Sequence, residues 1–486
     1  MEQAFSHLDF LSTLFIFVIG CAALVAIVLF IHDKWQTHDA VKRNYPVIAW
    51  FRPLAKRMGE FFRRYISYSD RKGEPFNRAI RDWVKEAAEG KEDTRGFGST
   101  RKKNSGNVIL LKSSVFPSEP EEFTDAPILT IGPDCRHPYQ PPSFFNMSAL
   151  SFGAISAPAA EALSYGTEMA GCWLNTGEGG LAPYHTKGNG DIVFEMGTAK
   201  YGVRDKEGNL DKEKLKELAQ NPQIKMFEIK LSQGAKPGKG GILPACKVTK
   251  EIAEIRNIPE NEDSISPNRH KEAANTLQLL DFIAELREIT GKPVGIKTAL
   301  GDPAWVKELC EEVIQRGENA APDFLTIDGS EGGSGAAPMM LMDYVALPIR
   351  IALPETAKII HEHELKERIR LIASGQLVTP GDVAWALAAG ADYVVSARGF
   401  MFSIGCIQAM RCHTNTCPSG VATHDLHLQK ALKPQEKKHG VCNYVNRVRE
   451  ETALIARTCG LRHVREFTPE HIFIFNQSNN KEVSHA

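Results

Sequence analysis

The stretch Leu371-Ile-Ala-Ser-Gly-Gln376 is followed sixteen residues later by Asp392-Tyr-Val-Val-Ser-Ala-Arg-Gly399. Each is a short apolar run that ends in small residues, and an amphipathic stretch separates the two. This alternation is typical of parallel strands joined by helices.

The same alternation extends upstream to about residue 140. It gives eight candidate strands, of which the fourth has the weakest pattern: 146–152, 172–176, 226–232, 263–266, 293–299, 323–329, 370–375 and 392–397. Helical patterns at 275–289 and 304–316 repeat apolar residues at spacings of three and four, as the outer ring of a barrel requires. We therefore expect an α/β fold, a (β/α)8 TIM barrel.

The ends of the seventh and eighth strands are candidate phosphate-binding loops. Glycines there let backbone N–H groups approach an anion, and a short helix after the eighth strand points its positive end at it. The candidate residues are Gly375, Gln376, Ala397, Arg398 and Gly399.

Three cysteines follow the eighth strand with a C-x5-C-x4-C spacing, at Cys406, Cys412 and Cys417. Thiolates are the ligands that iron-sulfur clusters need, and three ligands on one loop suit a 3Fe-4S cluster. Two alternatives remain open. The thiols can be buried structural cysteines, or they can bind zinc with His413, although the paired C-x2-4-C spacing of structural zinc sites is missing.

Residues Leu11 to Ile31 form an uncharged run of 21 residues, long enough for a helix that crosses a membrane. A cleaved signal peptide is the rival interpretation, but the preceding residues include Glu2 and Asp9 instead of a basic region. Basic residues outnumber acidic ones after the run, which predicts a single-pass membrane protein with its catalytic domain in the cytoplasm. The basic residues after the run are Lys34, Lys42, Arg43, Arg52, Lys56, Arg57, Arg63 and Arg64.

The sequence thus divides into four expected parts. Residues 1–32 are a membrane anchor, and 33–105 are a basic and aromatic segment with a linker. This segment either lies on lipid headgroups or packs on the domain that follows. Residues 106–430 are the barrel with the cysteine loop, and 431–486 are a closing helix, expected from Tyr444 to Cys459, and a frayed tail. The net charge of −1 argues against nucleic acid as a partner, and ten dispersed cysteines favour a reducing compartment.

Four further segments appear in one order with the cysteine loop. They are Leu150-Ser-Phe-Gly-Ala-Ile-Ser156, Asn175-Thr-Gly-Glu-Gly-Gly180, Lys230-Leu-Ser-Gln-Gly-Ala-Lys-Pro-Gly-Lys-Gly-Gly241 and Asp328-Gly-Ser-Glu-Gly-Gly-Ser-Gly-Ala336. Over about residues 140–430 the chain resembles the FMN-binding synthase domain of glutamate synthases. The resemblance implies that the phosphate is that of FMN.

The resemblance also implies a role for individual residues. Ser151, Gly153 and Ala154 would lie against the isoalloxazine ring, Asn175 would meet its polar edge, and Lys297 would face its N1–C2 carbonyl region. A cation there stabilises the anionic reduced flavin. The alternative interpretation of Lys297 is a salt-bridged barrel lysine.

Four residues match positions that handle 2-oxoglutarate or its imine in the family: Glu178, Gln233, Lys236 and Arg256. We expect Glu178, Gln233 and Lys236 to be catalytic and Arg256 to bind substrate, because a dicarboxylate needs cationic partners. Taken alone, Lys236 is a solvated loop lysine and Arg256 lies on the polar face of a helix. Two substrate positions depart from the family pattern, with Ile242 in place of a glutamine and Asn275 in place of a serine.

The expected function is reduction of 2-iminoglutarate, formed from 2-oxoglutarate and ammonia, to L-glutamate. The family's glutaminase domain and a Rossmann G-x-G-x-x-G motif are not recognised in the sequence. Ammonia would then come from solution or a partner, and electrons from a donor such as a ferredoxin or a reductase subunit. Two other hypotheses are an FMN and iron-sulfur oxidoreductase acting on a different 2-oxo acid, imino acid or amine, and a non-catalytic membrane redox sensor.

Overall fold

The structure is a computed structural model that describes residues 2–36, 42, 45–51, 54–55, 58–59, 62, 70–92, 94–103 and 108–475, without the side chains of 2–9 and 475. The chain divides into two compact units, Met1–Arg78 and Ala79–Ala486. The expected frayed tail from Asn476 and most of residues 37–69 lie outside the described part.

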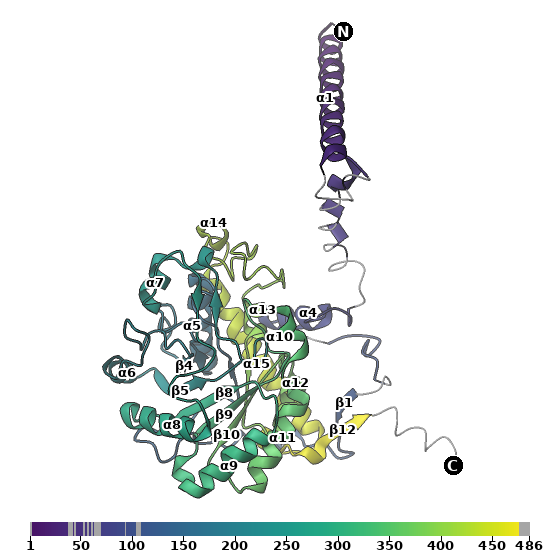
Figure 1. Ribbon diagram of the computed structural model, residues 1–486. Helices are drawn as coiled ribbons and strands as arrows, with labels where there is room; N and C mark the ends of the chain where they lie inside the picture. The colour runs from purple at the N-terminus through teal and green to yellow at the C-terminus, as the bar shows by residue number, and fades with distance from the viewer. Residues whose placement is uncertain are drawn as a thin grey trace. The chain divides into compact units, whose positions relative to one another are not determined.

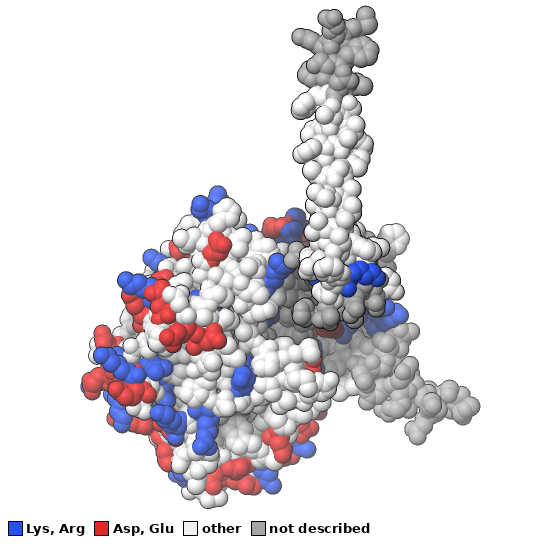
Figure 2. Space-filling view, turned by 45° about the horizontal axis from the view of Figure 1, so that its top comes forward, with Lys and Arg blue, Asp and Glu red and all other residues white. Residues whose placement is uncertain are grey.

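The first unit contains helix α1 (Glu2–Trp35) and a short 3-10 helix, η1 (Ile48–Phe51). Within α1, the most apolar 18-residue window of Phe10–Trp35 has a mean hydropathy of 3.2, and none of that window is buried against the protein. Figure 2 shows this stretch as a rod that is free of charged residues over most of its length. By length and composition α1 can cross a membrane, a test that a signal sequence also passes.

The second unit is built on an eight-stranded parallel sheet that curls into a nearly closed barrel (Figure 1). The neighbouring strands follow the order β2-β11-β10-β9-β8-β5-β4-β3. The Met147 backbone N–H donates to the Trp173 carbonyl over 3.1 Å and brings the first and last strands of that order together. The barrel strands are β2 (Phe145–Met147), β3 (Leu174–Asn175), β4 (Ile192–Met196), β5 (Ile224–Lys230), β8 (Val294–Thr298), β9 (Phe324–Asp328), β10 (Arg370–Ser374) and β11 (Tyr393–Ser396).

The fold class is confirmed, but the fourth expected strand is wrong. Residues 263–266 contain β7 (Ser264–Ile265), which pairs antiparallel with β6 (Ile242–Leu243) in a separate two-stranded sheet. The missed barrel strand is β4, whose five residues are all buried. Its charged Glu195 interrupts the continuous apolar run by which a strand buried on both faces is recognised.

Helices surround the barrel in Figure 1. The helices expected at 275–289 and 304–316 are confirmed as α8 and α9, and the closing helix α15 begins ten residues before Tyr444. The helices of this unit are α4 (Arg78–Ala88), α5 (Ala157–Ala170), α6 (Lys212–Ala219), α7 (Lys250–Arg256), α8 (Thr276–Thr290), α9 (Ala304–Arg316), α10 (Met339–Tyr344), α11 (Ile349–Glu362), α12 (Pro380–Ala388), α13 (Arg398–Ser403), α14 (Leu426–Gln429) and α15 (Pro434–Thr458).

Near its N-terminal border, this unit packs against two of its C-terminal elements, α15 and β12 (Ile472–Phe475). In α4, Trp83 packs edge-on against Tyr444 of α15 with ring centroids 6.1 Å apart, so the end of the juxtamembrane segment packs on the domain. Strand β1 (Val108–Leu111) pairs antiparallel with β12.

One end of the barrel is held by an ion-pair network at the start of its strands. Asp323 accepts from Arg368 over 2.9 Å and from Arg287 over 3.0 Å, and also from the Val294 backbone N–H over 2.8 Å. A buried carboxylate with this many donors stabilises the fold, since each of its oxygens is satisfied. Residues expected to do chemistry gather at the opposite, carboxyl ends of the strands, where barrel active sites lie.

Candidate active site

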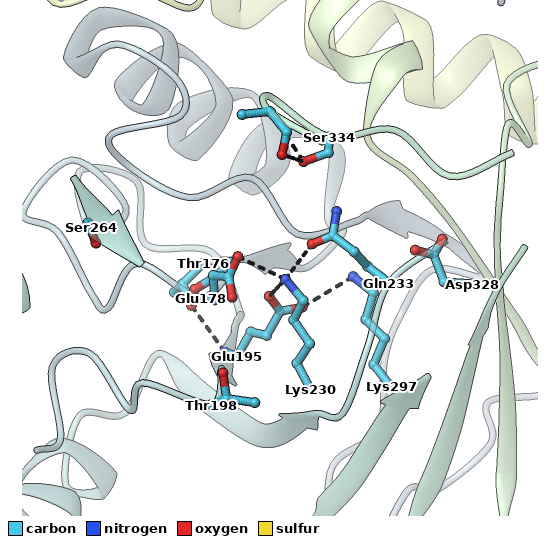
Figure 3. A network of polar contacts seen from close by, with 12 residues as sticks. Thr176, Glu178, Glu195, Thr198, Lys230, Gln233, Ser264, Lys297, Asp328 and Ser334 are labelled. Atoms are coloured by element: carbon cyan, nitrogen blue, oxygen red, sulfur yellow. Dashed lines mark hydrogen bonds and ion pairs between the residues drawn. The ribbon is translucent and has the colours of Figure 1, made fainter. Parts of the chain in front are cut away.

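A cluster of buried charges lies where β5 ends. Lys230, the last residue of β5, contacts Glu178 over 3.0 Å and donates to the Gln233 amide oxygen over 2.5 Å (Figure 3). Lys236 is in the following loop and is 3% exposed. The structure therefore brings together the three residues expected to be catalytic and adds Lys230 to them.

Charge partners set the pKa values in this cluster. Burial raises the pKa of Glu178, but the charges of Lys230, Lys236 and Arg256 outweigh it and lower the value to about 2. Burial lowers the pKa of Lys236 to about 8, although Glu178 opposes the shift. At neutral pH Glu178 is thus a carboxylate, while Lys236 is close to its titration point.

Arg256 closes α7 and points into the same region. Its guanidinium donates to the Ser264 hydroxyl over 3.1 Å and the Phe152 carbonyl over 3.2 Å, and lies 5.0 Å from the Tyr201 ring centroid. Its buried Nε atom has no hydrogen-bond partner. Burial lowers the pKa of the guanidinium. Arg256 is therefore a buried, oriented cation and does not lie on the polar face of a helix.

Close packing accounts for two glycines in the loop after β5. A Cβ atom on Gly241 would lie 2.4 Å from a Glu178 carboxylate oxygen, and one on Gly234 would lie 1.8 Å from the Gly329 carbonyl oxygen. Side chains at these positions would displace Glu178 or the loop after β9. The loop follows β5, which is the fourth barrel strand in the structure. The sequence analysis counted the same strand, 226–232, as the third, because β4 was not recognised.

Lys297 lies at the end of β8 and is 5% exposed. Its Nζ atom lies 3.1 Å from Glu195 of β4. Burial lowers its pKa, but the carboxylates of Glu195, Glu228 and Asp328 raise it above the ordinary value overall. Lys297 is therefore a paired, charged lysine whose ammonium is held near the carboxyl end of the barrel.

Asn175 belongs to the same layer of the barrel. Its amide donates to Glu228 over 2.8 Å and its oxygen accepts from the Gly177 backbone N–H over 3.0 Å. Burial raises the pKa of Glu228, partly offset by Lys297. Both residues line a small cavity in the barrel interior together with Lys297.

The loop after β2 holds Ser151, Gly153 and Ala154. Gly153 has φ of 103°, and a Cβ atom there would come within 3.0 Å of the Arg256 guanidinium. The loop therefore borders the charged cluster. Its place agrees with the expected flavin contacts, which stay predictions.

The candidate phosphate-binding residues follow β10 and β11. Gly375 has φ of 132°, which only glycine adopts readily, and Gln376 has φ of 52°. A Cβ atom on Gly399 would lie 2.0 Å from the Tyr444 hydroxyl. Arg398 begins α13, with Ala397 directly before it, and donates to the Ser334 carbonyl over 3.1 Å. The backbone after β10 thus turns tightly and Gly399 is closely packed, while phosphate binding by these residues stays a prediction.

The cysteine loop packs against the loop after β2. Cys417 is buried, while Cys406 and Cys412 are partly buried. Within the described ranges, no three His, Cys, Asp or Glu side chains are gathered as a metal site. Lys247 donates to the carbonyls of Ala154 (2.7 Å), Cys412 (3.2 Å) and Ala422 (3.5 Å), and so connects the two loops.

Two expected substrate residues occupy other local roles. Ile242 begins β6 opposite Ile265. Asn275 is exposed and caps α8, because its side-chain oxygen accepts from the Gln278 backbone N–H over 2.9 Å. A serine can cap a helix in the same way, so this cap alone accounts for the residue.

Sequence reasoning missed Lys230 and Glu195. Lys230 was quoted as the first residue of a motif, and the signal that would have singled it out is a charged residue closing an apolar strand. Glu195 was hidden in the unrecognised strand β4.

Comparison with known proteins shows the family. Residues 113–462 match the conserved region in glutamate synthase. The glutamate synthase large subunit-like protein YerD of Bacillus subtilis is 39% identical, with 94% of each chain covered. The archaeal glutamate synthase (NADPH) of Archaeoglobus fulgidus is 33% identical over 65% of this chain. Only 58% of that relative's length is covered, so this chain spans little more than half of it.

Solved structures with a similar arrangement include the recombinant flavin-binding domain of baker's yeast flavocytochrome b2, with a TM-score of 0.45, 14% identity and 84% of each chain covered. A soluble mutant of the membrane-associated (S)-mandelate dehydrogenase from Pseudomonas putida gives a TM-score of 0.46 at 10% identity, with 75% of this chain and 87% of that chain covered. The family region covers most of this chain and the Bacillus relative aligns along nearly all of it. The chain therefore belongs to the glutamate synthase family and is an oxidoreductase of the glutamate synthase type.

Proposed function

We propose that the protein binds FMN and a 3Fe-4S cluster and catalyses the reductive amination of 2-oxoglutarate, or of a closely related 2-oxo acid, with ammonia. The observation that carries this proposal is the cluster of buried cations around Glu178. Lys230, Lys236 and Arg256 all act on this one carboxylate. Buried cations in excess of their partners favour an anionic ligand.

The substrate carboxylates would bind to this excess positive charge. Arg256 offers a guanidinium already oriented by Ser264 and Phe152, and its unpartnered Nε is a further donor. Lys230 and Lys236 supply buried ammonium groups. Gln233 holds Lys230 in place through its amide oxygen.

Glu178 acts as a fixed negative charge in this proposal. With a pKa of about 2 it stays ionised at neutral pH, so it is a poor proton donor there. Its carboxylate can accept a hydrogen bond from neutral ammonia, which suits assembly of the site where ammonia meets the 2-oxo group. Lys236, with a pKa of about 8, is the group matched to proton transfer near neutral pH.

The residues at the carboxyl ends of the strands suit FMN. The turn at Gly375, the close approach of Gly399 to Tyr444 and the buried ammonium of Lys297 provide a backbone cradle and a cation. When bound, FMN supplies the hydride that reduces an imine. Lys297 would face its N1–C2 carbonyl region, and Ser151, Gly153, Ala154 and Asn175 would line the ring.

The cysteine loop supplies the chemistry that an iron-sulfur cluster needs. Cys406, Cys412 and Cys417 are three soft ligands on one loop, and Lys247 fastens that loop to the one carrying Ala154. A cluster here would receive electrons from a ferredoxin or a reductase subunit.

Ile242 supports a second candidate substrate. It is a partly buried apolar residue of β6, beside the strand that carries the Arg256 partner Ser264. A 2-oxo acid with an apolar end would find a better contact there than a dicarboxylate. The fixed cations still require at least one carboxylate.

We also propose that α1 is an uncleaved anchor and that the barrel lies on the cytoplasmic side. The support is the apolar stretch Phe10–Trp35 and the basic residues that follow it.

The proposed function can be tested with full-length protein that is purified anaerobically in detergent. Its flavin and iron content are measured first, and then amination of 2-oxoglutarate with ammonia and an artificial electron donor. We expect flavin, iron and formation of glutamate. Flavin and iron without turnover on any 2-oxo acid would favour the redox-sensor hypothesis.

A further inference from the structure

Glu195 lies between Lys297, which the proposed function assigns to the flavin, and Lys230, which it assigns to the substrate carboxylates. It is 1% exposed. One carboxylate oxygen lies 3.1 Å from Lys297, and the other lies 3.9 Å from Lys230 (Figure 3). A single buried side chain therefore contacts the lysine assigned to the flavin and a lysine of the carboxylate-binding cluster.

Charges alternate along this line of residues. The ammonium of Lys297 is followed by Glu195, then by the ammonium of Lys230, and Lys230 is paired with Glu178 over 3.0 Å. The charge of Glu195 also acts on Lys236. A charge added near Lys230 therefore changes how strongly Glu195 interacts with Lys230 relative to Lys297.

The neighbouring strand carries a second buried carboxylate with different partners. Glu228 accepts from Asn175 over 2.8 Å and from Thr326 over 2.7 Å. Its charge acts on Lys297, as that of Glu195 does. Glu228 is thus a comparison for Glu195: a buried carboxylate beside Lys297 whose two hydrogen-bond partners, Asn175 and Thr326, are not among the cations of the carboxylate-binding cluster.

We propose that Glu195 is a positioning residue that couples occupancy of the carboxylate-binding cluster to Lys297, and through Lys297 to the flavin. The inference rests on the proposed function. When a substrate carboxylate draws Lys230 toward itself, the interaction of Glu195 with Lys230 weakens. The negative charge of Glu195 then compensates mainly the ammonium of Lys297. Lys297 then offers less positive charge to the reduced flavin, which becomes a stronger reductant when the acceptor is present.

The coupling is reciprocal, as linkage requires. Substrate that lowers the flavin midpoint potential must bind the oxidised enzyme more tightly than the reduced enzyme, by the matching factor. If Glu195 serves stability alone, the ligand-induced shift is the same in Glu195→Gln as in wild type.

The test compares wild type, Glu195→Gln and Glu228→Gln as purified holoenzymes. The flavin midpoint potential is measured with and without saturating 2-oxoglutarate. We expect 2-oxoglutarate to lower the wild-type potential. Measured above the pKa of about 7 to which burial raises Glu228, both variants should have a higher potential without ligand, because each then removes a negative charge beside Lys297. Glu195→Gln should lose most of the ligand-induced shift, while Glu228→Gln keeps it.

Glu195→Asp covers the case in which the amide variant does not fold. It retains the charge but is one methylene shorter, so it should keep a near wild-type potential without ligand and show a smaller ligand-induced shift. A full shift in Glu195→Gln, or in Glu195→Asp where only that variant folds, overturns the coupling while the proposed function stands. So does a wild-type flavoprotein whose potential ignores bound 2-oxoglutarate. Wild type without flavin refutes the proposed function itself, and the coupling falls with it.

Discussion

The imidazole of His424 lies 2.9 Å from the carbonyl oxygen of Gly153. His424 follows the cysteine loop, and Gly153 belongs to the loop expected to border the flavin. Burial lowers the pKa of His424 to about 4, so the ring is neutral at physiological pH and donates a hydrogen bond to the carbonyl. Together with Lys247, this contact fixes the cysteine loop to the flavin loop.

Lys247→Met should destabilise the barrel unit and loosen the cysteine loop. Lys247 is 1% exposed and donates to three carbonyls on two loops. Its loss leaves buried acceptors unsatisfied, which costs about 2 kcal/mol. Urea denaturation measures the free energy of unfolding, and iron analysis reports the loop. The exposed Lys250→Met is the control, and equal stability of the two variants would contradict the prediction.

Cys412→Ser should lose most of the bound iron and keep most of the FMN, because the expected phosphate contacts lie on the loops after β10 and β11. Metal analysis, EPR and flavin absorbance measure the two cofactors separately. Cys246→Ser is the matched control, since Cys246 is an exposed cysteine outside the C-x5-C-x4-C loop. One equivalent of zinc without iron in wild type would rule out the cluster.

The pH dependence of kcat/KM for the 2-oxo acid should report Lys236. Its pKa of about 8 lies below the ordinary lysine value. The ammonium is therefore present below pH 8 and is lost as the pH rises through that value, which lowers kcat/KM on the alkaline side. In Lys236→Arg the alkaline fall should move out of this range.

Glu178→Gln provides a sharper check of the same assignment. The charge of Glu178 raises the pKa of Lys236, so its removal should move the alkaline fall to lower pH. A profile that is identical in all three proteins would show that another group causes the fall.

Ile242→Gln should improve affinity for 2-oxoglutarate about tenfold if the amide reaches a buried carboxylate, since such a hydrogen bond contributes about 1–3 kcal/mol. Flavin reoxidation by a panel of 2-oxo acids with ammonia measures the preference. Wild type should prefer acids with an apolar end. If wild type already prefers 2-oxoglutarate and the substitution changes nothing, Ile242 is neutral.

A reporter that is active only outside the cytoplasm, fused after Ala486, should stay inactive, because the basic residues after α1 favour a cytoplasmic barrel. Deletion of residues 1–32 should give a more soluble protein that still binds flavin, since every barrel strand lies after residue 144. An active reporter would reverse the topology.

The sequence was a good guide where one local pattern decides the structure. Helix α9 was expected at its observed bounds, and α8 within one residue at each end. Strand β4 was not expected, because the charge of Glu195 is compensated by Lys297, 102 residues away. Periodicity contains no information about such a partner. For the same reason the motifs predicted Glu178, Gln233 and Lys236, while their connection through Lys230 to Glu195 required the fold.

The pairing of β1 with β12 has a consequence for biosynthesis. Val108 lies opposite Phe475, so β1 emerges from the ribosome long before its partner strand exists. Until then its backbone has an open edge that other chains can pair with. Because the two strands are joined only after the whole barrel between them has been synthesised, a ribosome that stalls within the last barrel strands would leave β1 exposed. Closure of this two-stranded sheet is therefore one of the last steps by which the chain completes its fold.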